Sequence, residues 1–278
     1  MSLRLAAPLV CALLVCAASL GAQQQDALDP NATIAATPAD LAGERDSVLP
    51  LLAFCTVFTC AVGAVVVSII YRNRKRTAAL EAKARSLGCA FRRKPTREDK
   101  QLTAGSNLTN VGRSRTIRNV IELPGAAGAR MTHFDFIYMT GSDQSSRTRQ
   151  QTVTRIQSPK LNLPEFDLRP ESVLAKIGQR LGMQDIDFDA WPEFSRTYLL
   201  RGPDEGVIRR MFTPDVLRYC EAHRSLWVSG ARDVLWFHRE NQRVAPEELA
   251  SFIDRAQETF ALFAADVELP SPPLSAKV

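Results

Sequence analysis

The longest uncharged apolar run in the chain covers residues 49–70. An uncharged helix of about 20 residues is long enough to cross the hydrocarbon core of a bilayer. A helix suits that environment because its backbone hydrogen bonds close within the segment. The run is followed at once by a basic cluster, Tyr71-Arg72-Asn73-Arg74-Lys75-Arg76. The sequence therefore predicts one transmembrane helix over residues 49–71.

The first 22 residues form a second apolar stretch of a different kind. Arg4 is their only charge, and the apolar residues 5–20 give way to small residues around Gly21. A short basic start, a short apolar region and small residues at its end are typical of a secretory signal peptide. We therefore interpret residues 1–22 as a signal peptide, with an uncleaved first membrane helix as the alternative.

Both interpretations give the same orientation for the rest of the chain. They place residues 23–48 outside and everything after Tyr71 inside. The outer segment carries a single basic residue, Arg45, among the acidic residues Asp26, Asp29, Asp40, Glu44 and Asp46. Because Lys and Arg are enriched on the cytoplasmic side of membrane spans, we expect a single-pass protein with a cytoplasmic C-terminal domain.

The segments that flank the span divide the chain further. Residues 23–48 have too little apolar content to build a core, so we expect a short disordered segment outside the membrane. About 200 residues follow the span, which is enough for one ordinary domain. We expect a basic juxtamembrane helix and linker over residues 72–116, an α+β domain over residues 117–265 and a disordered tail over residues 266–278.

Apolar spacing predicts the elements of the domain, because strands alternate and helices repeat every three or four residues. The predicted strands are residues 89–91, 119–123, 131–140, 151–157, 194–201, 225–229 and 233–239. The predicted helices are residues 77–87, 170–182, 204–211, 214–221 and a last segment that begins at Pro246. Residues 119–157 favour an antiparallel meander, with Phe134, Phe136 and Tyr138 on its core face. Mixed antiparallel strands and interspersed helices without a repeated βαβ rhythm define an α+β fold class.

An acidic motif, Asp185, Asp187 and Asp189, has the spacing that begins a calcium-binding loop. Such a loop requires glycine at its sixth position and glutamate at its twelfth, where this chain has Ala190 and Arg196. The motif is therefore interpreted as an acidic loop ahead of a strand, with a weak divalent site or an acidic contact for the basic segment as the alternatives.

The three histidines, His133, His223 and His238, form no close pair with another His or Cys at metal-ligand spacing. The chain also lacks a Gly-x-Ser-x-Gly elbow, a Gly-x-Gly-x-x-Gly motif and a phosphate-binding loop. No catalytic residue, cofactor site or metal site is predicted.

The basic residues after the span have a plausible partner in the membrane itself. Lys and Arg near an anionic bilayer contribute about 1 kcal/mol each to its attraction. We therefore expect contact with lipid headgroups at Arg72, Arg74, Lys75 and Arg76. Nucleic-acid binding is not predicted, because the basic stretch lacks interleaved aromatic residues and any DNA-reading motif.

Several stretches of the interior domain resemble the corresponding stretches of a known group of proteins. They are residues 132–140, Gln151-Thr152-Val153, residues 163–171, Asp185-Ile186-Asp187-Phe188, Pro192-Glu193-Phe194-Ser195 and residues 198–202. Together they resemble bacterial membrane-anchored proteins of unknown function. The resemblance implies a bacterial inner membrane location and carries no catalytic residue across.

These observations favour a membrane-tethered binding or interaction module of unknown ligand. The expected partners are the bilayer, its anionic headgroups and an unidentified protein, but no nucleic acid. Two alternatives remain. One is a membrane-tethered hydrolase with an unrecognised site around His133, His223 or His238. The other is a structural accessory subunit of a membrane complex.

Overall fold

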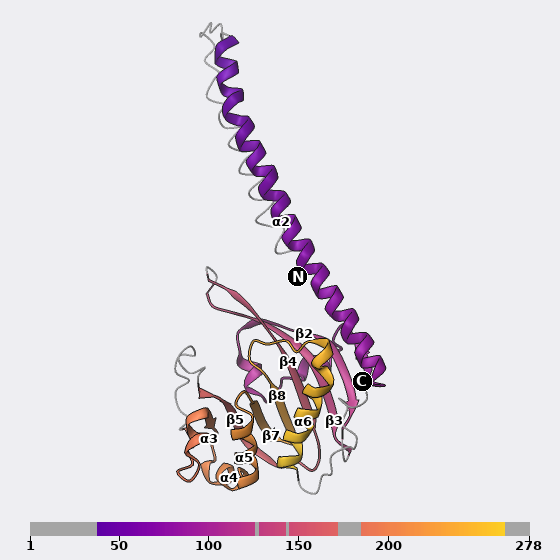
Figure 1. Ribbon diagram of the computed structural model, residues 1–278, viewed down its shortest axis with the longest axis vertical. Helices are drawn as coiled ribbons and strands as arrows, with labels where there is room; N and C mark the ends of the chain where they lie inside the picture. The colour runs from indigo at the N-terminus through magenta and orange to yellow at the C-terminus, as the bar shows by residue number, and fades with distance from the viewer. Residues whose placement is uncertain (1–37, 126–127, 143–144, 172–184, 265–278) are drawn as a thin grey trace. The chain divides into compact units, whose positions relative to one another are not determined.

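The computed structural model describes residues 38–125, 128–142, 145–171 and 185–264 (Figure 1). Its helices are α2 (Pro38–Ser86), α3 (Pro192–Thr197), α4 (Glu205–Met211), α5 (Pro214–Ala222) and α6 (Leu249–Phe263), with the 3-10 helices η1 (Asp99–Gln101), η2 (Asn107–Asn110) and η5 (Pro246–Glu248). Its strands are β1 (Ala90–Arg92), β2 (Arg113–Pro124), β3 (Arg130–Thr140), β4 (Arg147–Gln157), β5 (Leu163–Pro170), β6 (Tyr198–Arg201), β7 (Trp227–Arg232) and β8 (Val234–His238). The chain divides into two units, Met1–Ser68 and Ile69–Val278, and every described strand belongs to the second.

Helix α2 contains the apolar run. Within the described residues, its part Ala53–Ser86 is the one stretch of helix that is long and apolar enough to cross a membrane, and its apolar window of 18 residues has a mean hydropathy of 2.4. The helix begins at Pro38, so it also covers part of the segment 23–48 that the sequence predicts to be disordered. Proline suits the first helical turn, and the Ala, Leu, Glu and Arg residues that follow favour helix. The signal peptide predicted for residues 1–22 lies outside the described residues.

The C-terminal end of α2 lies where the sequence predicts it. Gly88 adopts a φ of +70°, which glycine tolerates because it has no Cβ to collide with the backbone. The N–H of Cys89 donates to the carbonyl of Ala84 at 2.8 Å and closes the last turn. Leu80 and Ala84 are fully buried, so this end of the helix is part of the domain core.

Eight strands form one sheet in the order β1-β2-β3-β4-β8-β7-β5-β6, and all described pairs of strands are antiparallel. The predicted meander is confirmed as β2, β3 and β4. Strand β2 begins at Arg113, earlier than the predicted start, within a segment that the sequence assigns to a loop. Two register shifts interrupt its alternation, and Ser114 and Asn119, which lie at these shifts, have positive φ. Such bulges break the period of two from which strands are recognised.

Strand β3 is buried on both faces. The predicted core face, with Phe134 and Tyr138, packs with Leu108 of η2. The opposite face, which the sequence predicts to be the less buried one, is covered as well, since Met131 lies in one core cluster with Leu80 of α2. A strand in the middle of a sheet that is covered on both sides loses the simple inside–outside alternation.

Strand β5 is missing from the sequence prediction. The register shift between Leu163 and Phe166 hides its alternation, although Leu163, Phe166 and Leu168 are buried. Pro170, predicted to start a helix, is the last residue of β5 instead. Most of the predicted helix 170–182 lies outside the described residues.

The strand predicted over residues 194–201 is divided between two elements. Pro192 and Glu193 occupy the first turn of α3, and only residues from Tyr198 onward form strand β6. Proline at a helix start and an acidic residue in the first turn both favour the helix. The backbone N–H of Phe194 donates to Oε1 of Glu221 at 3.0 Å, which satisfies one of the unpaired groups at that end.

The remaining predicted helices are confirmed, and the strands predicted over residues 225–229 and 233–239 pair as β7 and β8, with β7 continuing to Arg232. The side chain of Asp204 accepts from the N–H of Val207 and caps α4, whereas Thr213 makes no such bond at α5. Helix α6 buries the apolar stripe that its spacing predicts, including Leu249, Phe252 and Phe260. Figure 1 shows α6 lying over the sheet and α3, α4 and α5 grouped beside β5.

Gly230 of β7 provides a test of packing between neighbouring strands. A Cβ at this position would collide with the ring of Phe166 and lie 2.8 Å from Cδ1 of Leu163. We expect Gly230→Ala to destabilise the domain by about 1–3 kcal/mol, the usual cost of overpacking a core. Gly206→Ala is the control, because its Cβ would meet nothing closer than 3.7 Å and alanine favours the helix α4. Urea unfolding of the detergent-solubilised full chain measures both, and equal stability of the two variants would contradict this packing.

Candidate functional site

The last turns of α2 are fixed to the sheet by an ion pair. Nε of Arg76 donates to Oδ2 of Asp135 at 3.0 Å, and its Nη2 donates to Oδ1 at 2.8 Å. The third guanidinium nitrogen, Nη1, donates to the carbonyl of Val244 at 2.6 Å. The two side chains are only 12% and 3% exposed, so this bidentate pair is largely shielded from water. Two parallel N–H···O bonds fix the orientation as well as the distance of the partners.

Neighbouring strands complete the coordination of the Asp135 carboxylate. Nδ2 of Asn119 on β2 donates to Oδ2 at 2.8 Å, and the hydroxyl of Thr152 on β4 donates to Oδ1 at 3.1 Å. The Thr152 oxygen also accepts from the N–H of Val244 at 2.9 Å. We call this set, Arg76, Asn119, Asp135, Thr152 and Val244, the helix–sheet junction. It joins α2, three strands of the sheet and the segment before α6.

The junction keeps Asp135 ionised. Burial alone would raise the pKa of this carboxyl group, but the hydrogen bonds and charge of Arg76, together with Asn119, hold the pKa below its usual value. A buried carboxylate that is fully hydrogen-bonded and paired is stable only while all its partners stay in place. The junction therefore fixes the last turns of α2 to the sheet.

The structure separates the four basic residues that the sequence assigns to lipid headgroups. Arg72, Arg74 and Lys75 are exposed on α2. Arg76, by contrast, turns its guanidinium into the domain and pairs with Asp135. The side chains of consecutive helix residues point about 100° apart, so one residue of a basic run can face the protein while the others face outward.

The sequence prediction misses Asp135, Asn119 and Thr152. The signal available was an aspartate inside an alternating apolar strand, because a carboxylate on such a strand needs a partner if it is buried. Its partner Arg76 lies far away in the sequence, within a basic run that membrane topology already explains. Only the fold brings the two together.

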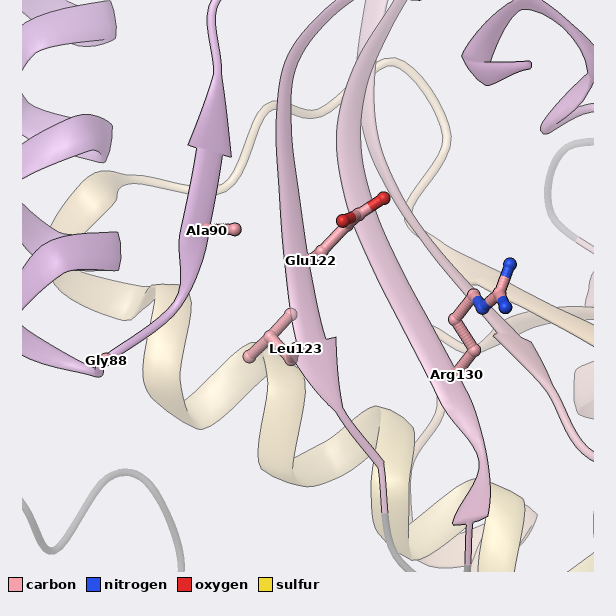
Figure 2. Close-up of a pocket in the computed structure, with 5 residues that line it drawn as sticks. All are labelled: Gly88, Ala90, Glu122, Leu123 and Arg130. Atoms are coloured by element: carbon pink, nitrogen blue, oxygen red, sulfur yellow. The ribbon is translucent and has the colours of Figure 1, made fainter.

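A second ion-pair cluster joins β1 to β2. Nη2 of Arg92 donates to Asp99 at 2.7 Å and to Glu122 at 2.8 Å. Hydrogen bonds from Arg92 lower the pKa of Glu122 against the effect of burial. Figure 2 shows the pocket beside it, lined by Gly88, Ala90, Glu122, Leu123 and Arg130. Glu122 and Arg130 project from neighbouring strands and carry opposite charges, so the pocket offers no excess charge for a ligand.

The three histidines lie in separate environments. His133 is fully buried, its Nδ1 lies 3.1 Å from the hydroxyl of Thr154, and burial lowers its pKa to about 4. His238 is also fully buried beside the Trp227 ring, and burial lowers its pKa to about 3. Nδ1 of His223 lies 2.9 Å from the carbonyl of Tyr219 at a half-buried position. Neither buried imidazole reaches a surface where a substrate could bind.

The acidic motif is engaged in contacts within the protein. Nε of Arg201 donates to the carboxylate of Asp185 at 2.5 Å, and Nη1 of Arg209 donates to the backbone carbonyl of Asp187 at 2.6 Å. Within the ranges that the structure describes, no group of three or more His, Cys, Asp or Glu residues could hold a metal ion. These contacts explain the motif as part of the loop that leads into α3.

Comparison with known proteins identifies the fold. No protein-family model matches the sequence, and no curated protein matches it. Among solved structures, the chain is similar to the crystal structure of the mycobacterial trehalose monomycolate transport factor A, TtfA. The TM-score is 0.50 at 11% sequence identity, and the match covers 68% of this chain and 94% of TtfA. The chain is thus a long apolar helix followed by an α+β domain with a TtfA-like fold, and at this identity the similarity concerns the fold alone.

Proposed function

We propose that this chain is a single-pass protein of a bacterial inner membrane, with a cytoplasmic α+β domain that acts as a membrane-tethered binding module. The observation that carries the proposal is the helix–sheet junction. It attaches the domain core directly to the helix that bears the apolar run. A domain attached by a buried bidentate pair differs from one that hangs on a flexible linker, because its tether is part of its own fold.

The spacing along α2 supports a position at the membrane surface. Ile70 ends the uncharged run, and Arg76 is already bound to the domain. At 1.5 Å per residue, the helix rises only about 9 Å between them. Arg72, Arg74 and Lys75 lie in this interval with exposed side chains, which suits the headgroup contacts proposed for them. The domain would therefore meet its partners at the inner leaflet.

The hydrolase alternative receives less support. General acid–base catalysis requires a titratable group within hydrogen-bond reach of the substrate, with a pKa near the working pH. His133 and His238 are fully buried, and their pKa values are lowered to about 4 and about 3. A substrate could reach either ring only if the core opened.

A second candidate is an accessory factor of an envelope-lipid transport machinery. The fold similarity favours it, because TtfA is described as a transport factor for trehalose monomycolate. A factor that acted on transport at a membrane would need a tether, and the helix–sheet junction would supply one. On this view the binding partner of the domain is another component of the transport machinery.

The proposed orientation predicts a labelling pattern in spheroplasts. Ser251 is an exposed residue of α6. In a full chain without other cysteines, Ser251→Cys should escape a membrane-impermeant maleimide until the membrane is permeabilised. Thr33→Cys, which precedes the apolar run, is the control and should react at once in intact spheroplasts. Labelling of Ser251→Cys from outside would overturn the cytoplasmic position of the domain.

A further inference from the structure

Four arginines gather at the free end of the β2–β3–β4 meander. They are Arg113 and Arg115 of β2 and Arg147 and Arg149 of β4. Thr140 of β3 pairs with Arg147, and Met139 pairs with both Arg113 and Thr148. Since neighbouring strands lie about 4.8 Å apart, β2 and β4 are separated by about 10 Å at this level. We call these four residues the basic strand end.

The basic strand end is accessible and keeps a positive excess. Arg113, Arg115 and Arg147 are exposed, and Arg149 is half-buried. In the parts of the chain that the structure describes, no carboxylate forms an ion pair with Arg115, Arg147 or Arg149. Beyond the effect of burial, Glu240 raises the pKa of Tyr138 and Arg149 lowers it, so one carboxylate lies in the same region as these arginines. An excess of exposed guanidinium groups attracts an anionic surface.

The register of α2 on the sheet places this charge toward the Ile70 end of the helix rather than its Ser86 end. Ala84 lies beside β1. Strand β1 pairs with Ile121 and Glu122 of β2. These two residues in turn stand opposite residues 132 and 133 of β3. Arg76, two turns earlier in the helix, contacts Asp135. Moving back along α2 toward Ile70 therefore corresponds to moving along β3 toward Thr140.

The distances along the two elements agree. From Asp135 to Thr140 the strand extends about 17 Å at 3.3 Å per residue. From Arg76 to Ile70 the helix rises about 9 Å. Measured from the Arg76–Asp135 pair, the segment of β3 is therefore the longer of the two. Figure 1 shows β3 and β4 projecting beyond the rest of the sheet.

We propose that the basic strand end lies on the anionic headgroups of the same bilayer that holds α2. This gives the domain a second membrane contact and fixes which face it turns to the cytoplasm. The inference rests on the proposed function, because a membrane surface at Ile70 is its starting point. Ser142, Ser145 and Ser146 in the connecting turn are polar and exposed, which suits the headgroup layer rather than the hydrocarbon core.

A bilayer is the occupant that this geometry favours. The basic strand end belongs to the same folded unit as Ile70, so the surface that receives the apolar run is within its reach without any additional partner. Near an anionic surface, each arginine raises the binding constant about five-fold. Exposed arginines at this end would add to the attachment that α2 already provides.

The test compares hydrogen exchange of the full chain in nanodiscs of phosphatidylcholine alone and of phosphatidylcholine mixed with phosphatidylglycerol. Backbone amides of residues 138–142 and 145–150 should exchange more slowly in the anionic discs. In the double variant Arg147→Gln/Arg149→Gln this added protection should be about 25-fold smaller, a five-fold decrease for each charge removed. Added salt should reduce the protection as well, because screening weakens contacts between exposed charges.

A matched control removes two exposed charges elsewhere. Arg210 of α4 and Arg218 of α5 are exposed on helices that lie at the other end of the domain in Figure 1. Arg210→Gln/Arg218→Gln should leave the protection of the strand end unchanged. The unfolding midpoints of both double variants show whether folding is preserved.

Equal exchange of the native strand end in neutral and anionic discs would overturn the inference. It would leave the proposed function standing, because α2 would still hold the chain in the disc. The inference is overturned whether exchange is equally fast or equally slow in the two kinds of disc, since in both cases the contact would not depend on anionic lipid. Failure of the chain to enter discs at all would contradict the proposed function itself.

Discussion

Replacing Asp135 with alanine is expected to destabilise the domain by about 3–5 kcal/mol, the usual cost of removing one partner of a buried ion pair. The reason is that Arg76 would remain buried with its charge unbalanced. Asn119 and Thr152 would each lose an acceptor as well. Urea unfolding of the full chain in detergent micelles measures the change in the free energy of unfolding.

An exposed ion pair supplies the control for this prediction. Asp215 and Arg218 of α5 lie 2.7 Å apart, but their side chains are 78% and 66% exposed. Asp215→Ala should change stability by less than about 1 kcal/mol, since water screens such pairs. Similar small losses for Asp135→Ala and Asp215→Ala would show that the helix–sheet junction does not hold α2 to the sheet.

A double substitution separates the ion pair from the packing around it. Arg76→Leu/Asp135→Leu removes both charges and keeps apolar volume, so it should recover much of the stability that Asp135→Ala loses. If the proposed function is right, this variant also keeps the domain at the membrane.

Stability should fall by about 3 kcal/mol between pH 6.5 and pH 5 because of His133 and His238. Both imidazoles are buried and neutral, with pKa values lowered from 6.5 to about 4 and about 3. In the unfolded chain they bind protons as the pH falls through 6.5, whereas in the folded chain they remain neutral down to these lower values. The unfolded state therefore takes up about two more protons, which favours unfolding. Above pH 7.5 the contribution to stability of these two groups is complete and independent of pH.

Single variants test the source of this acid sensitivity. His238→Leu removes one of the two groups, so the slope of the free energy of unfolding against pH between 5 and 6.5 should be about half the native slope. The Asp135 carboxyl group also has a lowered pKa, but it titrates below this interval. An unchanged slope in a His133→Leu/His238→Leu double variant would show that other groups cause the acid sensitivity.

The local elements of this chain were accessible from its sequence when their signals were uninterrupted. The end of the helix predicted over residues 77–87, the helix predicted over residues 204–211 and the helix after Pro246 are confirmed by the structure. The missed or divided elements are those in which the signal is broken. Register shifts conceal β5 and the start of β2, and Pro192 converts the start of a predicted strand into α3.

Candidate site residues were harder to predict because their roles depend on distant partners. Membrane topology explains every basic residue after the apolar segment equally well, so it does not distinguish one from another. The fold distinguishes Arg76, which pairs with Asp135, from Arg72, Arg74 and Lys75, which remain exposed. The arginines of the basic strand end come from two strands whose adjacency is a property of the sheet.

The sequence by itself determined the long apolar helix and the α+β class, because hydrophobicity over a continuous segment and local periodicity are properties of neighbouring residues. The tertiary structure alone decided the strand order, the helix–sheet junction and the position of the basic strand end. These features depend on pairing across the sheet, where burial of a charge is possible only when a partner from another part of the chain is brought into contact with it.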